Sequence, residues 1–222
     1  MSVTANIVKR LKYTPKAQPF SINRFSNLGS RGAVAKVLSR FAASGELERL
    51  SRGIYMRPKL SHFTGYVRPS TKSVLRAIAK HNREIIQVHG AEAVRYFGLS
   101  TQMQIRPVYY TSGASREVKV GAKRIRLLHV APKKLRHAGT IVGLALCALF
   151  YLGKKGVSDT VISSITAKMA PSEFRQLADG EIPIWMQVAL RHAISWRSQQ
   201  AVAERRPLAT ERAHICPYGD EK

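Results

Sequence analysis

The feature that most constrains this chain is a run of apolar residues at helical spacing between residues 30 and 44. The residues on this face are Val34, Val37, Leu38 and Phe41. They recur at i, i+3, i+4 and i+7, so they line one side of a helix and must face a core. Ser30 is a favourable N-cap residue, and Gly45 favours the end of a helix. The sequence therefore predicts a helix over about residues 30–44.

The opposite face of this predicted helix carries small and basic side chains and no acid. Its members are Gly32, Lys36, Ser39 and Ala43, with Arg40 at the edge. A helix that lies in the major groove of DNA needs such a face. Ser30 and Arg31 stand at the helix start, where free backbone N–H groups and the helix dipole favour a phosphate. We expect this helix to contact DNA.

The segments around this helix predict a winged helix-turn-helix over residues 1–60. A helix is expected over residues 3–13, and a short one begins at Ser21 and stops at Leu28-Gly29. After residue 45, two short alternating runs surround a turn containing Gly53, which predicts a β-hairpin. Arg52 at the tip of this wing would contact the sugar-phosphate backbone or the minor groove. The alternative is a basic three-helix domain that uses the same surface for protein contacts.

Charge points to a polyanionic partner. The chain has 37 Lys and Arg against 13 Asp and Glu, a formal net charge of +24. The excess is carried by the first 140 residues, whereas residues 141–222 are nearly neutral. Such a field favours nucleic acid or an anionic membrane surface, and the segregation favours nucleic acid. A ribosomal or structural role would also fit a charge of this size.

Membrane insertion and export are not indicated. The most apolar stretch, residues 141–152, spans about 12 residues against the ~20 needed to cross a bilayer. The N-terminus has no apolar core of signal-peptide length. We therefore expect a buried helix at residues 141–152, no membrane partner, and a cytoplasmic, nucleoid-associated protein.

Beyond residue 60 the pattern is mixed. Residues 61–69 are expected to form a linker, residues 70–206 a mixed α/β domain, and residues 207–222 a loose tail. Expected elements are helices over 73–81 and 91–97 and strands over 84–88, 107–111, 116–120 and 123–130. A final helix over 184–205 would carry a stripe of Trp185, Val188, Ala189, His192 and Trp196, which is either part of the core or a dimer or partner surface. The fold class is α+β: an N-terminal winged helix, then a mixed α/β domain ending in helices.

A second basic cluster falls on and just after the predicted strands. Its members are Lys119, Lys123, Arg124, Arg126, Lys133, Lys134 and Arg136. It is either a solvated basic face or a second surface that follows phosphates. A third possibility is a docking site for an acidic partner.

Several of these segments resemble a known family. Residues 28–40 (Leu-Gly-Ser-Arg-Gly-Ala-Val-Ala-Lys-Val-Leu-Ser-Arg) and residues 45–58 resemble the N-terminal domain of AbiEi-type antitoxins. These are transcriptional regulators of type IV toxin–antitoxin (abortive infection) systems. Gly90-Ala-Glu-Ala, Gly98-Leu-Ser-Thr-Gln and Tyr110-Thr-Ser-Gly are similar to a subfamily of them, so the resemblance covers roughly residues 5–155.

The resemblance implies a winged-helix domain that binds double-stranded DNA at its own promoter, at inverted repeats, and represses its own operon. It also implies a C-terminal domain that counters a nucleotidyltransferase-type toxin. Residues 156–222 match no pattern of the family.

Catalytic chemistry is not indicated. Cys147 and Cys216 form no metal-binding pattern, and the seven histidines are scattered. Glu117-Val-Lys119 is the kind of acid and lysine pair found in metal-dependent nucleases, but only Glu84 and Glu92 could supply a further acid between residues 61 and 140. We expect no metal, no cofactor and no enzymatic activity.

Three functions therefore remain open. The first is a repressor, monomer or homodimer, in which Lys36, Ser39 and Arg40 lie in the major groove and the remaining contacts come from Ser30, Arg31 and Arg52. The second is a protein that sequesters a toxin and has no specific DNA binding. The third is a nuclease built around Glu117 and Lys119.

Overall fold

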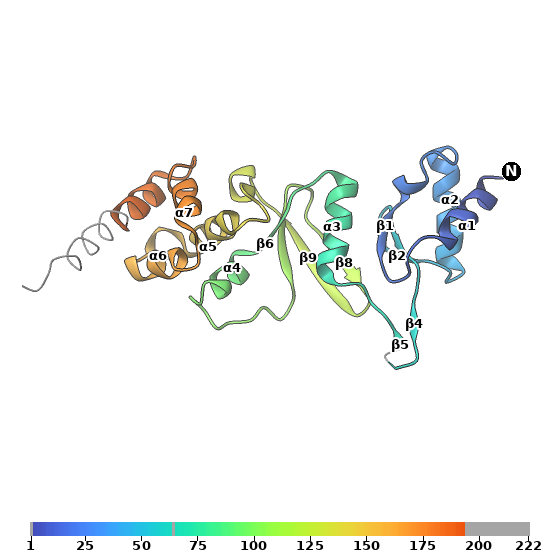
Figure 1. The fold of residues 1–222 in the computed structure, drawn as a ribbon, viewed down its shortest axis with the longest axis horizontal. Coiled ribbons are helices and arrows are strands. Elements are labelled where there is room, and N and C mark those ends of the chain that lie inside the picture. The colour runs from blue at the N-terminus through green and yellow to red at the C-terminus, as the bar shows by residue number, and fades with distance from the viewer. Residues whose placement is uncertain (1, 64, 194–222) are drawn as a thin grey trace, which may run out of the picture.

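Helices and three small sheets succeed one another along an elongated molecule in the computed structural model (Figure 1). The structure describes residues 2–63 and 65–193. The N-terminal unit stands at one end and the C-terminal helices at the other, with a four-stranded sheet between them. The expected α+β class is confirmed.

The N-terminal unit is a small helical layer on a three-stranded antiparallel sheet. Its elements are α1 (Val3–Lys12), β1 (Pro19–Ser21), the 3-10 helix η1 (Ile22–Phe25), α2 (Arg31–Ala43), β2 (Glu48–Ser51) and β3 (Ile54–Met56). The strand order is β1-β3-β2. Phe20 of β1 pairs with Tyr55 of β3, so the first strand closes the edge opposite β2.

The predicted central helix and hairpin of this unit are present. Val34, Val37 and Leu38 of α2 are buried, and Phe41 is half-buried. The Ser30 hydroxyl accepts a hydrogen bond from the Ala33 amide at 3.3 Å, so Ser30 is the N-cap. Hydrophobic periodicity therefore placed α2 correctly.

The expected short second helix needs a correction. Only the four residues of η1 are helical there, with a 3-10 pattern, and β1 comes directly before them. Ser21 caps η1 as expected, because its hydroxyl accepts from the Asn23 amide at 3.1 Å. The prediction missed β1 because three residues are too few to show an alternating pattern.

The expected linker also differs from the structure. It contains a two-stranded hairpin of β4 (Leu60–Ser61) and β5 (Gly65–Tyr66), which projects from the body of the molecule (Figure 1). Phe63 at its end is 98% exposed. Pro58, Gly65 and Pro69 indicated an interruption of the regular structure here. Gly65, the first residue of β5, has a φ of 65°, which glycine adopts readily.

The central part is a four-stranded sheet flanked by helices. Its elements are α3 (Thr71–Asn82), β6 (Ile86–Val88), α4 (Gly90–Tyr96), β7 (Val108–Thr111), β8 (Arg116–Val120) and β9 (Lys123–His129). The strand order is β6-β7-β9-β8, and only the β7–β9 pair is parallel. Each of these elements was expected from the sequence, with ends shifted by a few residues.

A shared core joins the N-terminal unit to the central part. Leu50, Ile54 and Met56 of the small sheet belong to the same buried cluster as α3 and the strands β8 and β9. The ring of His81, at the end of α3, lies against Gly53, and its Nδ1 is 2.7 Å from the Ser21 hydroxyl. The two parts are therefore packed against each other and not merely tethered.

The C-terminal part is helical. It contains the 3-10 helix η2 (Pro132–Leu135), α5 (Ile141–Gly156), α6 (Asp159–Thr166), α7 (Pro171–Ala178) and a further helical stretch over residues 184–193. The expected apolar helix at 141–152 is confirmed as α5, whose buried side chains include Leu146 and Leu149. Within the described residues, no helix combines the length and apolarity needed to span a bilayer.

As a core face, the predicted stripe on the last helix is confirmed only for Trp185 and Ala189, which are half-buried and pack against the core. Met186, Leu190 and Ala193 are the buried residues of the helical stretch, whereas Val188 and His192 are exposed. Both sets have helical spacing, so periodicity alone does not choose between them. Trp196 and the expected tail lie outside the described residues.

Candidate nucleic-acid interface

The exposed face of α2 carries the residues that the sequence singled out. Arg31, Lys36, Ser39 and Arg40 are all exposed, and α2 contains no acid. The Ser30 hydroxyl is engaged in capping the helix, so its side chain is held by the protein itself. The N–H groups of the first helical turn have no partner within the helix and can bind an anion there.

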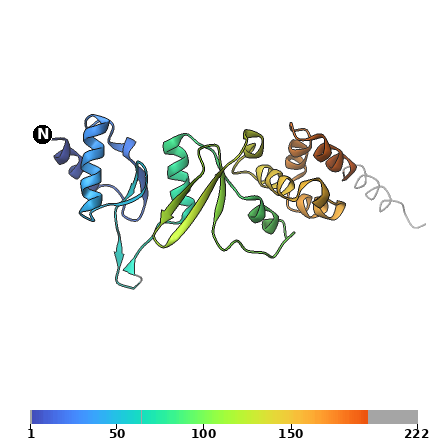
Figure 2. The same ribbon diagram turned by 180° about the vertical axis from the view of Figure 1, so that it is seen from behind.

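A groove separates the N-terminal unit from α3. It has a volume of about 690 Å³ and lies between β1 and η1 on one wall and α3 on the other. Figures 1 and 2 both show α3 running beside the N-terminal unit. Its titratable lining residues are all potential cations: Arg24, Arg76, Lys80 and His81. With no acid in the lining, the groove is an electropositive surface suited to a phosphate backbone.

His81 links this groove to α2. Burial, and then the positive charge of Arg31, lower the pKa of His81 below its usual value. The start of α2 is therefore close enough to the groove for Arg31 to act on this ring. A neutral His81 remains hydrogen-bonded to Ser21 at pH 7, which holds β1 against α3. Arg31 at the start of α2 therefore adds to the positive potential of this groove.

The predicted wing tip does not project freely into solvent. The turn between β2 and β3 is held against the end of α3, where Gly53 meets the His81 ring. Arg52 beside it is exposed. Arg52 therefore lies near the same junction and not on a loop that projects into solvent.

The structure separates the second basic cluster into two groups. Lys119 on β8 pairs across the strands with Arg124 on β9, and Arg126 pairs with Glu117. All four are exposed, and Arg124 also approaches Glu117 at 3.8 Å. With Lys123 at the start of β9, these side chains form a basic patch that contains one acid.

The other group belongs to η2 and the residue after it. Lys133 is exposed, and the Lys134 ammonium lies 5.8 Å from the centre of the Phe150 ring. Arg136 forms an ion pair with Glu181 and donates a second hydrogen bond to its carbonyl oxygen at 2.7 Å. Arg136 therefore ties η2 to the C-terminal helices.

The acids considered for nuclease chemistry have structural partners. Glu84 is buried and forms an ion pair with Arg116. Burial raises the pKa of this carboxyl, but hydrogen bonds lower it by more, so the net shift is downward. The donors are Arg116, Asn82 and Thr111. In the part of the chain that the structure describes, no three His, Cys, Asp or Glu side chains are grouped to hold a metal ion.

Sequence reasoning missed the α3 side of the groove. Lys72, Arg76 and Lys80 recur every four residues and are all exposed, so they form a basic stripe along α3. The spacing was visible in the sequence. What periodicity could not provide was the packing of α3 beside the N-terminal unit, which places Arg76 and Lys80, but not Lys72, in the lining of the groove.

The fold and these surfaces define an α+β protein with a basic helix face and a basic groove. Residues 6–176 match the model of DUF6088, a family of unknown function, and the chain belongs to this family. No curated protein and no solved structure matches the chain.

Proposed function

We propose that this protein is a sequence-specific DNA-binding regulator whose N-terminal unit is a winged helix-turn-helix. The observation that carries the proposal is the acid-free, basic face of α2, with the basic groove beside α3 as a second cationic surface. The order of helices and strands in residues 3–56, with the strand order β1-β3-β2, also fits a winged helix in which η1 takes the place of the second helix.

In this proposal α2 lies in the major groove of DNA. Lys36, Ser39 and Arg40 would face base edges, where Arg and Lys hydrogen-bond guanine most often. The first turn of α2, with Arg31, would hold a phosphate. The groove would follow the flanking backbone through Arg24 and Lys80.

The resemblance to AbiEi-type antitoxins supports a biological role for this binding. The chain would repress its own operon and act as the antitoxin to a nucleotidyltransferase-type toxin. The helices after residue 140 are nearly neutral in net charge, so the part of the protein away from the DNA would be free to meet a protein partner.

The test is a mobility shift with the gene's own upstream DNA against scrambled DNA over a salt series. The wild type should prefer the upstream DNA, and the preference should persist at about 200 mM salt, since phosphate contacts alone weaken steeply with salt. Arg31→Ala with Arg40→Ala should lower affinity for the upstream DNA at least tenfold. The matched control is Lys154→Ala with Lys155→Ala, which removes two exposed cations at the end of α5 and should have no such effect.

The two parts of the surface should give different results. Arg24→Ala with Lys80→Ala should weaken binding to both DNAs alike and reduce the slope of log K against log salt by about 2, because each phosphate contact contributes roughly 0.9. Equal, steeply salt-dependent binding of the wild type to both DNAs would refute a sequence-specific regulator. An absence of DNA binding would instead favour a role limited to sequestering a toxin.

A further inference from the structure

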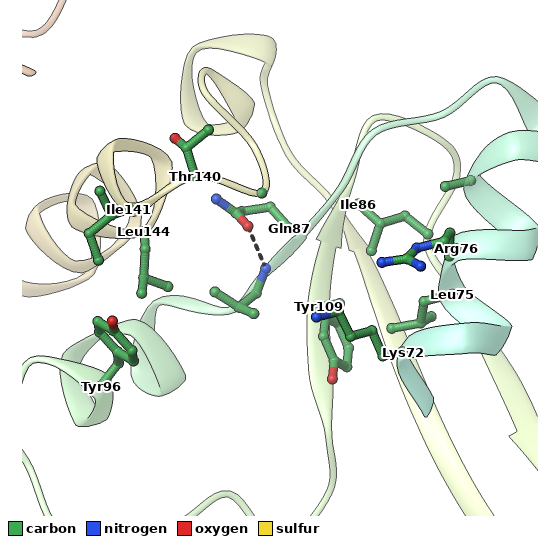
Figure 3. Close-up of a pocket in the computed structure, with 13 residues that line it drawn as sticks. Lys72, Leu75, Arg76, Ile86, Gln87, Tyr96, Tyr109, Thr140, Ile141 and Leu144 are labelled. Atoms are coloured by element: carbon green, nitrogen blue, oxygen red, sulfur yellow. Dashed lines mark hydrogen bonds between the residues drawn. The ribbon is translucent and has the colours of Figure 1, made fainter. Parts of the chain in front are cut away.

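A second cavity lies beside α3 and shares only Arg76 with the basic groove. It has a volume of about 640 Å³ and is lined by α3, the edge strand β6 and its neighbour β7, Tyr96 of α4 and the start of α5 (Figure 3). Sites for small organic molecules commonly measure roughly 300–1,000 Å³. The size of this cavity is therefore that of a small-molecule site.

The charges around the cavity favour an anion. Lys72 and Arg76 on α3 line one wall, and no acidic side chain is part of the lining. Within residues 2–63 and 65–193, neither cation has an ion-pair partner. Thr140, the N-cap of α5, lies on the opposite side of the cavity from them (Figure 3). The dipole of that helix adds positive potential at this end.

Between these two polar ends the walls are apolar. They are formed by Leu75, Ile86, Val88, Ile141 and Leu144, with the Tyr109 ring alongside. Such walls favour a ligand with a flat or apolar body, because its binding removes apolar surface from contact with water. The cavity thus has a cationic end at α3 and apolar walls.

We propose that this cavity binds a small organic anion with a flat, largely apolar body. Its phosphate or carboxylate group meets Lys72 and Arg76, and its body packs against the apolar walls. The cavity shares Arg76 with the proposed DNA-binding groove, but binding of the anion does not depend on DNA binding.

The experiment is calorimetric titration of the full chain with two sets of probes. One set contains the four ribonucleoside 5′-monophosphates, and the other contains the aromatic carboxylates indole-3-acetate and 1-naphthoate. The nucleosides and the matching amides serve as neutral counterparts. At least one anion should bind at 1:1 stoichiometry with a Kd of about 1 mM or below, and its neutral counterpart should bind at least tenfold more weakly. If the anion that binds is a nucleotide, the preferred anionic group is phosphate, and if it is an aromatic carboxylate, the preferred group is carboxylate.

Variants connect the binding to this cavity. Lys72→Ala with Arg76→Ala changes two exposed residues and should abolish binding of that anion without loss of fold. The matched control is Lys80→Ala on the same helix, which does not line the cavity and should leave the Kd unchanged.

Two results would overturn the proposal. The first is that none of the anions gives saturable binding at about 1 mM. The second is binding that Lys72→Ala with Arg76→Ala leaves intact, because the anion would then occupy another part of this basic chain. Both readouts are made without DNA, so neither depends on the outcome of the mobility-shift experiment.

Discussion

The substitution Gly53→Ala would test the junction between the N-terminal unit and α3, because it adds one methyl group where the two parts are in contact. Its φ is +75°, a backbone region that residues with a Cβ rarely adopt. A Cβ at this position would overlap Nε2 of His81 and lie 3.0 Å from its Cε1. Gly53→Ala therefore introduces both a backbone strain and a collision across the junction.

The two effects have separable sizes. A left-handed conformation costs an L-residue roughly 1–2 kcal/mol. The His81 ring must also move, which breaks its 2.7 Å hydrogen bond to Ser21. A hydrogen bond of this kind contributes about 0.5–1.5 kcal/mol. We expect Gly53→Ala to lower the free energy of unfolding by about 2–3 kcal/mol in total.

The structure offers a matched control in Gly45. Its φ is +79°, but a Cβ there would meet no atom within 4 Å, so Gly45→Ala carries the backbone strain alone. Urea unfolding of the wild type and both variants, followed by circular dichroism, gives the comparison. Gly53→Ala should be the less stable by about 1 kcal/mol. Equal losses of stability in the two variants would show that the Gly53–His81 contact is not formed as described.

Three further predictions follow from buried or capping groups. Glu84→Gln should destabilise the protein by about 2–4 kcal/mol in urea unfolding at pH 7, because it removes the ion pair with Arg116. Since folding lowers the pKa of Glu84, its contribution is complete above the unfolded value of about 4.3 and is lost as the pH falls through the folded value. The wild type should therefore lose more stability than Glu84→Gln between pH 5 and pH 3, and parallel losses would contradict this assignment. Ser30→Ala should cost about 1 kcal/mol through loss of the α2 cap, and Ser30→Thr should restore most of it. Burial raises the pKa of the Cys147 thiol to about 12. In a Cys216→Ser background, Cys147 of the native protein should therefore resist a thiol reagent at pH 8, whereas the protein unfolded in urea should be labelled. Rapid labelling without urea would show that this thiol is accessible.

Local signals predicted much of the fold. The apolar residues of α2 lie on one face, and Gly45 marks its end, so both the helix and its exposed basic side followed from the sequence. Strands β8 and β9 showed plain alternation around the turn at Gly121. These elements were predictable because their patterns extend over several residues and reflect one buried face.

The remaining features depend on packing that no local pattern encodes. The short strand β1 is defined by its pairing with β3, which is more than thirty positions away in sequence. The choice of Met186 over Val188 as a buried residue depends on which side of the helix meets its neighbours. The groove residues on α3 became part of the candidate site only through the shared core. The sequence therefore predicted the α2 side of the site and missed the α3 side.

That shared core limits how this protein can be divided. Leu50, Ile54 and Met56 would be exposed to water if the chain were cut at the β4–β5 hairpin, and so would the facing residues of α3 and the sheet. Domains joined by flexible linkers can be exchanged between proteins and reorient freely, whereas a large apolar contact fixes their orientation. The N-terminal unit is therefore not an interchangeable module. Its orientation depends on the core that it shares with the rest of the protein. The residues on the two sides of this core can therefore change in evolution only by matched substitutions.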